Sequence, residues 1–303
     1  MKLLDRIRIS FHYRWSLLIN AIAKPFLWKP QIMTAHETVE YILKNHASIS
    51  RFGDGEIMIM EGEKILFQMQ DNCLSERMKR VFTNPADGLL LAIPRPLMSS
   101  DDMCIREANS WRNHLRQYRL HWLKYLQRNR IYGCAHISRF YTNYDDISIA
   151  DRNIAQLRRI WNNRDVVFVE GEYSRLGVGN ECFNNTKSIE RILCPAESAF
   201  DRYSEILAES TKQPKDKLFI LALGPTASCL ADDLTRAGYQ ALDLGHIDVE
   251  FEWWRMKAKS RVPVRGKYTN EAVLTGIAGK PVNGGLTEDE MVQYNAQIIA
   301  KVL

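Results

Sequence analysis

Short, continuous apolar runs separated by helix-like stretches are the feature that most limits how this chain folds. The clearest run is Leu218–Leu223, six apolar residues that stop at Gly224-Pro225-Thr226. A strand that is apolar at every position is buried on both faces, which is typical of a parallel sheet covered by helices. The runs predicted to form strands are 49–52, 89–93, 131–137, 166–169, 218–223 and 241–244.

The stretches between these runs carry helical signals. Thr34, with Glu37 three residues later, has the pattern of a capping box and predicts a helix over 36–47. Pro225 suits the first turn of a helix that continues to about Ala237. Strands that alternate with helices predict an α/β fold, with a mostly parallel sheet and helices on both faces. The other predicted helices are 103–128, 147–161 and 199–210, and a loop is predicted over 170–185.

Composition places the chain among ordinary globular proteins. Its 303 residues are enough for one large domain or two small ones, and 46% of them are hydrophobic and 25% charged. The net charge of +5 is mildly basic and does not by itself indicate nucleic acid. The six dispersed cysteines form no Cys-x-x-Cys pattern, which argues against a zinc site and a secreted disulfide scaffold. We therefore expect a cytoplasmic protein with no nucleic-acid partner.

Residues 1–30 form a basic, aromatic arm that we separate from a single domain over 31–303. The arm carries six cations against one acid, Asp5, with aromatic and aliphatic residues between them. Asn20 and Lys24 interrupt its apolar run, which is too short for a membrane span and lacks the clean centre of a secretory signal. Two interpretations stay open: peripheral attachment to the inner face of a membrane, or packing on the protein's own body or on a sister subunit in a homo-oligomer.

Polar loops follow four of the predicted strands, and in parallel α/β sheets ligands bind at such carboxyl ends. The first loop contains Asp54 and Glu56, two carboxylates that alternate with Gly53 and Gly55. Carboxylates at this spacing are able to face one hard cation, Mn²⁺ or Mg²⁺, that also holds substrate phosphates. Taken alone, Asp-Gly is better explained as a common turn.

The second and third loops offer groups that bind phosphates and sugars. Arg175 and Asn180 lie in a glycine-rich loop, where a guanidinium would grip phosphate oxygens and an amide would bind hydroxyls. The alternative for Arg175 is a surface salt bridge. Gly224 and Thr226 lie where a strand turns tightly into a helix, and the free N–H groups of such a turn attract anions. An ordinary strand–helix junction has the same pattern, and the lysine of an ATP-binding P-loop is missing.

The fourth loop places His246 two residues before Asp248. If the backbone there is extended, this spacing points both side chains the same way. They would then serve as metal ligand, general base or hydroxyl orienter. The commoner fate of a single histidine is a partly buried side chain that is already hydrogen-bonded.

In their order along the chain, the four loops resemble those of the bacterial GT-D type glycosyltransferases, a domain long described as one of unknown function. The resemblance covers roughly residues 35–270. It implies a Rossmann-like fold, a sugar-nucleotide donor that is commonly a UDP-sugar, and a divalent metal held by an Asp-x-Glu motif, here Asp54 and Glu56. The segments that carry it are Ser50–Glu56, Ser174–Asn180, Leu223–Ala227 and Leu242–Asp248, with Lys187–Ala196 between the second and third.

The resemblance leads to an expected reaction, the transfer of a sugar from a nucleotide-sugar to a glycan, glycoprotein or lipid-linked acceptor in bacterial surface glycan synthesis. Asp248 or His246 would activate or orient the acceptor hydroxyl. Two alternatives stay open, a nucleotide-sugar binding protein without transferase activity and a nucleotide-sugar hydrolase. The residues expected to bind the donor are Arg51, Gly53, Arg175, Asn180, Gly224 and Thr226.

Overall fold

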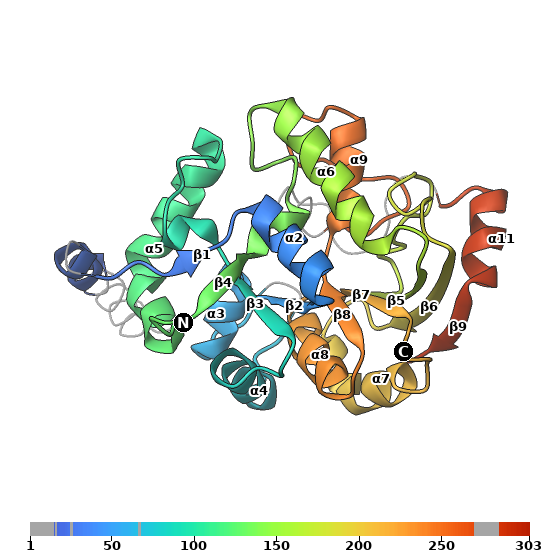
Figure 1. The fold of residues 1–303 in the computed structure, drawn as a ribbon, viewed down its shortest axis with the longest axis horizontal. Coiled ribbons are helices and arrows are strands. Elements are labelled where there is room, and N and C mark those ends of the chain that lie inside the picture. The colour runs from blue at the N-terminus through green and yellow to red at the C-terminus, as the bar shows by residue number, and fades with distance from the viewer. Residues whose placement is uncertain (1–14, 16, 25–26, 66–67, 270–284) are drawn as a thin grey trace, which may run out of the picture.

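The computed structural model describes residues 15, 17–24, 27–65, 68–269 and 285–303. These residues build one nine-stranded sheet in the order β1-β4-β3-β2-β8-β7-β5-β6-β9, in which every neighbouring pair is parallel (Figure 1). The strands are β1 (Gln31–Ile32), β2 (Ser48–Arg51), β3 (Leu89–Ile93), β4 (Ile131–Cys134), β5 (Asp165–Gly171), β6 (Ser188–Cys194), β7 (Leu218–Ala222), β8 (Gln240–Asp243) and β9 (Ile298–Lys301).

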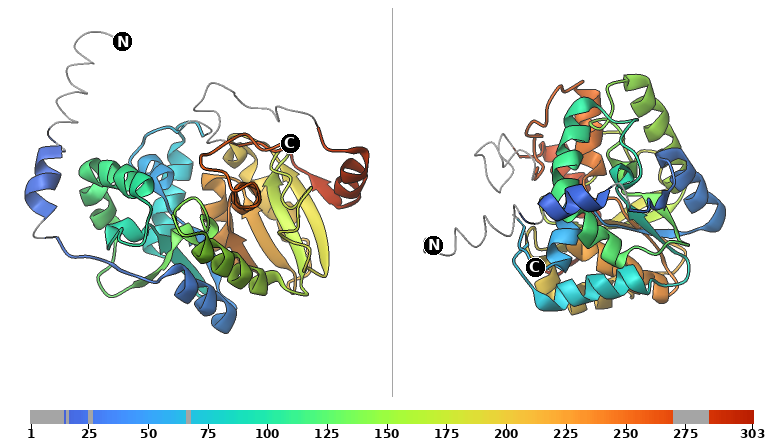
Figure 2. Two further views of the ribbon diagram at one scale, coloured as in Figure 1. Left: turned by 90° about the horizontal axis from the view of Figure 1, so that it is seen from above. Right: turned by 90° about the vertical axis from the view of Figure 1, so that its left-hand side faces the viewer.

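Helices cover both faces of this sheet (Figure 2). Helices α3, α4, α5, α7 and α8 share one hydrophobic core with the sheet, and α2, α6 and α9 share another. The α-helices are α2 (Ala35–Asn45), α3 (Asp54–Met60), α4 (Asn72–Thr83), α5 (Ile105–Tyr125), α6 (Ile147–Trp161), α7 (Tyr203–Ser210), α8 (Pro225–Arg236), α9 (Ile247–Arg255) and α11 (Glu288–Ala296). The short 3-10 helices are η2 (Arg95–Leu97), η3 (Ala135–Ser138) and η4 (Ala199–Arg202).

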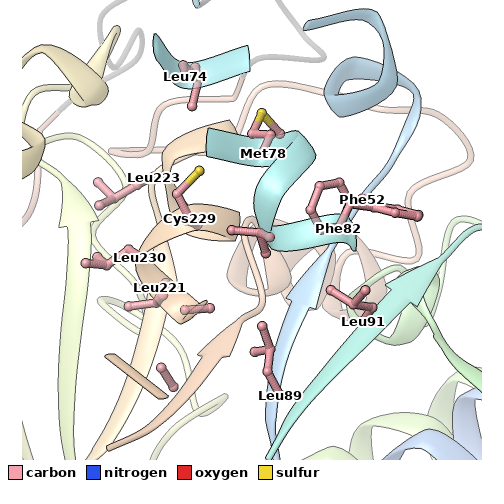
Figure 3. Close-up of a cluster of buried hydrophobic side chains, with 14 of the residues drawn as sticks. Phe52, Leu74, Met78, Phe82, Leu89, Leu91, Leu221, Leu223, Cys229 and Leu230 are labelled. Carbon is pink, nitrogen blue, oxygen red and sulfur yellow. The ribbon is translucent and has the colours of Figure 1, made fainter. Parts of the chain in front are cut away.

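The two cores explain why the strands are apolar at every position. In β3, Leu89 and Leu91 point into the core beneath α4 and α8, whereas Leu90 points into the core on the opposite face. Figure 3 shows Leu89 and Leu91 beside Phe82 of α4, in the first of these cores. The prediction of a mostly parallel sheet with helices on both faces is therefore confirmed.

All six predicted strands are present, although the run 131–137 is shorter than expected. β4 ends at Cys134, and the chain then turns into η3. The predicted capping box is also present, since Thr34 Oγ1 accepts a hydrogen bond from Glu37 N at 3.1 Å and Glu37 Oε2 accepts one from Thr34 N at 2.7 Å. All six cysteines are free thiols.

Several elements lie outside the predicted ranges. β6 has Glu190 and Arg191 in its middle, so its sequence does not read as an apolar run. The Asp54-Gly55 dipeptide does not form an isolated turn, because it begins α3. The segment around Asp248 is helical rather than extended, since α9 begins at Ile247. The other elements without a prediction are β1, β9, α4 and α11.

The strand order creates two points where ligands are expected. The chain leaves β2 toward β3, whereas it leaves β8, the neighbour of β2, toward β9 on the opposite side. It likewise leaves β5 toward β6, whereas it leaves β7, the neighbour of β5, toward β8. Connections that diverge in this way leave a crevice at the carboxyl ends of the two strands. One crevice lies at the ends of β2 and β8, and the other at the ends of β7 and β5.

Candidate functional site

The four polar loops singled out in the sequence lie at the carboxyl ends of β2, β8, β7 and β5, four adjacent strands of the sheet. Segments that are up to about 190 residues apart in the chain are thereby gathered at one edge, as the register between Ile49 and Leu242 shows. This confirms that the loops meet in space. The contacts of each side chain then decide what it is able to do.

A shallow pocket that is open to solvent lies over the ends of β5, β6, β7 and β8. Its wall includes Gly171 at the end of β5, Gly224 after β7 and His246 after β8. Three residues with hydroxyl groups also line it: Ser174, Ser198 and Tyr268. Of these, only Ser174 belongs to a loop segment that the sequence singled out. The remaining lining residues are Gln68, Pro195, Ala196, Ala199, Ala222, Leu223 and Pro225.

The turn from β7 into α8 has the geometry of an anion site. Gly224 has φ +53° and ψ −140°, a conformation that favours glycine, and it serves as the N-cap of α8. Pro225 follows at the first helical position, where its missing N–H costs nothing. The Thr226 hydroxyl in the same turn is fully buried and has no hydrogen-bond partner among the described residues. A buried hydroxyl without a partner is costly, so a ligand atom that reached it would be stabilised.

The start of α8 is held against β2 by two reciprocal hydrogen bonds. Ser50 Oγ donates to Ser228 O at 3.0 Å, and Ser228 Oγ donates to Arg51 O at 2.9 Å. The sequence around these serines contains no pattern that would have identified the pairing. Through it, the Gly224 turn keeps a fixed position relative to the end of β2, where α3 begins.

The two carboxylates of the first loop lie in the first turn of α3. Glu56 Oε2 accepts a hydrogen bond from Gly53 N at 2.7 Å, and Gly53 is the N-cap of the helix. Burial raises the pKa of Glu56 to about 7, and the nearby carboxylates of Asp243 and Asp54 add to the rise. Asp54 is exposed and makes no hydrogen bond or ion pair with the described residues.

The oxygens of these two carboxylates suit a divalent cation in chemistry, although positions 54 and 56 of a helix point to different sides, unlike the two positions of the extended backbone that the sequence suggested. Asp54 has both oxygens open, and Glu56 Oε1 makes no hydrogen bond in the described part of the chain. No cluster of three or more His, Cys, Asp or Glu side chains suited to a metal occurs among the described residues. A cation held here would therefore complete its coordination with water and substrate oxygens, as Mg²⁺ commonly does at phosphate sites.

Arg51 was predicted to bind phosphate, but its guanidinium is occupied within the protein. Nε donates to Asp243 O at 2.7 Å, Nη2 to Asp243 Oδ1 at 3.1 Å, and Nη1 to Ser138 Oγ at 2.7 Å. Arg51 thus links β2, β8 and η3. A Cβ at Gly245 would clash with Arg51 Nη2, and the φ of +52° at this position also favours glycine. The structure assigns Arg51 a positioning role instead.

Asn180 was predicted to bind the donor and Asp248 to activate the acceptor. In the structure, the two side chains are hydrogen-bonded to each other. Asn180 Nδ2 donates to Asp248 Oδ1 at 2.7 Å and to Glu252 Oε1 at 2.8 Å. Asp248 is fully buried, pairs with Lys267, and also accepts from Gly177 N at 2.9 Å. Because α9 is helical, Asp248 points away from the direction of His246. These contacts hold the Arg175–Asn180 loop against α9.

Arg175 is likewise engaged, although less completely. Its Nη1 donates to Gly266 O at 2.7 Å, and its backbone φ of +51° is unusual for a non-glycine residue. Its Nε is buried without a hydrogen-bond partner among the described residues. Gly177 and Gly179, with φ of +71° and +78°, let the same loop turn back on itself.

A second buried ion pair, for which no sequence pattern was found, holds this loop from the other side. Arg191 of β6 pairs with Glu170 of β5, and both side chains are almost completely buried. Glu170 Oε2 accepts from Leu176 N at 2.7 Å, while Arg191 Nη2 donates to Leu176 O at 2.7 Å. The loop between Arg175 and Asn180 is thus fixed by the Glu170–Arg191 pair and the Asp248–Lys267 pair.

Sequence comparisons agree with the order of the loops. A family profile described as "Glycosyltransferase GT-D fold" matches residues 49–272. The chain is 36% identical over 291 residues to "Glycosyltransferase GlyD" of Streptococcus pneumoniae serotype 4 and 33% identical over 261 residues to "Probable glycosyl transferase Gly" of Streptococcus gordonii. These matches cover 94% and 84% of this chain but only 35% and 38% of the two relatives. The chain therefore spans little more than a third of their length.

Solved structures resemble the fold over almost the whole chain. One, described as "The highly conserved domain of unknown function 1792 has a distinct glycosyltransferase fold", has a TM-score of 0.83 at 34% identity and covers 96% of this chain and 99% of that chain. Another, "A New Glycosyltransferase (DUF1792) from Streptococcus sanguinis", has a TM-score of 0.84 at 31% identity and covers 91% of this chain and 100% of that chain.

Proposed function

Because the chain belongs to the family of glycosyltransferases with the GT-D fold, we propose that it transfers a sugar from a nucleotide-sugar, a UDP-sugar, to a glycan, glycoprotein or lipid-linked acceptor in bacterial surface glycan synthesis. One observation carries the proposal. The pocket over β5–β8 contains the Gly224 turn, and α3 begins at the neighbouring strand with two carboxylates that have open oxygens. An anion site beside a cation site suits a donor diphosphate.

The nucleotide-sugar would lie across the ends of β7 and β8. The N-terminus of α8 offers backbone N–H groups and the positive end of the helix dipole to a phosphate, and Thr226 offers its hydroxyl. Ser174 and Ser198 in the pocket wall would bind the hydroxyls of the nucleoside or the sugar. Ser174 in the pocket wall directly precedes a loop that two buried ion pairs fix in place.

Asp54 and Glu56 would hold Mn²⁺ or Mg²⁺ through their open oxygens. When bound, such a cation stabilises the negative charge that develops on the departing nucleoside diphosphate. The hydrogen bond from Gly53 N to Glu56 Oε2 keeps the Glu56 carboxylate in place. His246 lines the pocket at the N-cap of α9 and is the residue that we propose to orient the acceptor hydroxyl.

The reaction is tested by incubating the protein with Mn²⁺ and a panel of UDP-sugars and measuring the release of UDP, with and without candidate acceptors. We expect one donor to be consumed faster when an acceptor is present. Release that is independent of every acceptor would instead indicate a hydrolase. No release, together with saturable binding of a UDP-sugar, would indicate a binding protein.

Replacing Thr226 with valine tests where the donor lies. Valine has nearly the same shape, so the variant should raise the KM for the donor up to about tenfold, the cost of one hydrogen bond. Its thermal unfolding midpoint should be unchanged or higher, because a buried hydroxyl without a partner is removed. Steady-state kinetics and thermal denaturation measure the two effects.

Thr235→Val is the matched control, since Thr235 lies farther along α8 and its hydroxyl bonds to Ala231 O within the helix. This control should leave the KM for the donor unchanged. Equal KM values for Thr226→Val and the unmodified protein would show that the Thr226 hydroxyl does not contact the donor.

A further inference from the structure

The helix of the N-terminal arm is fixed against the outer side of α5 by one buried asparagine. Residues 15 and 17–23 are helical, and Figure 2 shows this helix next to α5 at the end of the molecule. Asn20 is only 3% exposed. Its Nδ2 donates to Gln117 O at 3.0 Å and its Oδ1 accepts from Leu120 N at 3.2 Å. These bonds set which side of the helix faces α5.

The side opposite Asn20 is apolar and exposed. Trp15, Leu18 and Ile22 have a spacing of three and four residues, which places them on one face of a helix. They are 53%, 52% and 63% exposed, and Ile19 between them is 37% exposed. A helix that served only to cover its own protein would turn such residues inward. This face, formed by Trp15, Leu18, Ile19 and Ile22, is called the arm face below.

The helix to which the arm is bonded, α5, is basic. α5 carries five Arg or Lys residues and a single carboxylate, Glu107. Three of the five, Arg112, Arg116 and Arg119, form no ion pair with the described residues. Arg116 directly precedes Gln117, to which the arm is bonded. Lys24 and Lys29 are exposed just beyond the arm helix.

The combination of apolar and basic groups selects the partner. A surface that binds only through charge does not need three exposed large apolar side chains, whereas an anionic bilayer takes up both kinds of group. A second copy of the chain docked through the same face would bring two basic α5 helices together, and their like charges repel. No helix among the described residues is long and apolar enough to cross a membrane.

We propose that the arm face and the basic side of α5 form a peripheral attachment surface for an anionic lipid bilayer. Trp15, Leu18 and Ile22 insert at the level of the headgroups, and Arg112 and Arg116 lie near lipid phosphates. This attachment is independent of the proposed transferase reaction.

The position of α5 gives the attachment a consequence that does rest on the proposed function. On its other side, α5 is hydrogen-bonded to the segment after α3. Tyr118 Oη donates to Glu63 Oε1 at 2.6 Å, and Tyr125 Oη donates to Glu61 Oε1 at 2.5 Å. Helix α5 therefore lies between the arm and α3, whose first residue is Asp54. Attachment through the arm would hold the proposed metal site near the lipid surface, where a lipid-linked acceptor would be found.

The experiment is sedimentation of the full chain with phosphatidylcholine vesicles, prepared with and without phosphatidylglycerol. We expect binding to the anionic vesicles that weakens as salt is added, and little binding to the neutral ones. The triple variant Trp15→Ser, Leu18→Ser, Ile22→Ser should lower the partition coefficient at least about tenfold. The double variant Arg112→Gln, Arg116→Gln should lower binding to the anionic vesicles about 30-fold.

A matched triple variant serves as the control, with serine at three equally exposed apolar positions elsewhere: Ile147, Met256 and Val292, which are 44%, 49% and 70% exposed. It should bind vesicles like the unmodified chain, and all variants should keep its thermal unfolding midpoint. Equal binding by the two triple variants would overturn the proposal. A second outcome would also overturn it: the chain does not bind vesicles, light scattering detects a dimer, and the arm variant abolishes that dimer.

Discussion

Asn in place of Asp54 should lower UDP release in the presence of donor and Mn²⁺ by about 10²–10³-fold, the usual cost of losing one group that stabilises transition-state charge. Asp54 is exposed and makes no hydrogen bond or ion pair in the described chain, so its carboxylate adds little to folding. Asparagine is also well accepted near a helix N-terminus. The loss should therefore appear in kcat and in Mn²⁺ affinity, measured by titration calorimetry, and not in the unfolding midpoint.

Asp289→Asn is the control for this prediction. Asp289 is another exposed carboxylate in a first helical turn, in α11, and it does not line the pocket. It should leave turnover and Mn²⁺ affinity unchanged. If Asp54→Asn retained metal-dependent turnover, the assignment of Asp54 as a metal ligand would be wrong, although the donor pocket would remain open to test through Thr226.

The fold was predictable from sequence because its central strands are buried on both faces. Leu218–Ala222 and Leu89–Ile93 lie inside the sheet, so every residue in them is apolar and the run is visible without structural knowledge. The outer strands lack this property. β6 has Glu190 and Arg191 in its middle, and β1 has only two residues. Such strands depend on tertiary contacts that a local pattern does not contain.

The same reasoning found where the polar loops lie, but it did not show which other side chains contact them. The loops were located correctly, and the resemblance to the GT-D family drawn from them is confirmed. Sequence shows that a charge stands at a strand end, but not whether another charge from a distant segment neutralises it. Asp243 is 192 residues from Arg51, and Lys267 reaches Asp248 from a segment beyond α9. These distant partners hold the side chains of Arg51 and Asp248 in place within the protein.

Methionine in place of Arg191 should destabilise the protein by about 3–5 kcal/mol, because it leaves the carboxylate of Glu170 buried without its partner. Burial raises the pKa of Glu170 even with Arg191 beside it, and removing the guanidinium raises that pKa further. A carboxyl group whose pKa is higher in the folded protein than in the unfolded chain lowers the stability of the folded protein. It does so at every pH at which the group is ionised in the unfolded chain. The penalty should therefore shrink as the pH falls toward about 4.5, the ordinary pKa of glutamate.

Urea denaturation at several pH values measures this effect, and the double variant Glu170→Gln, Arg191→Met is its control. Glutamine carries no charge, so the double variant should recover more than half of the lost stability and show little dependence on pH. Arg191 also donates to Leu176 O at 2.7 Å, so both variants should raise the KM for the donor by loosening the loop beside the pocket. A double variant no more stable than Arg191→Met would show that packing of Arg191 against Phe168 and Tyr294, and not the buried charge of Glu170, sets the loss.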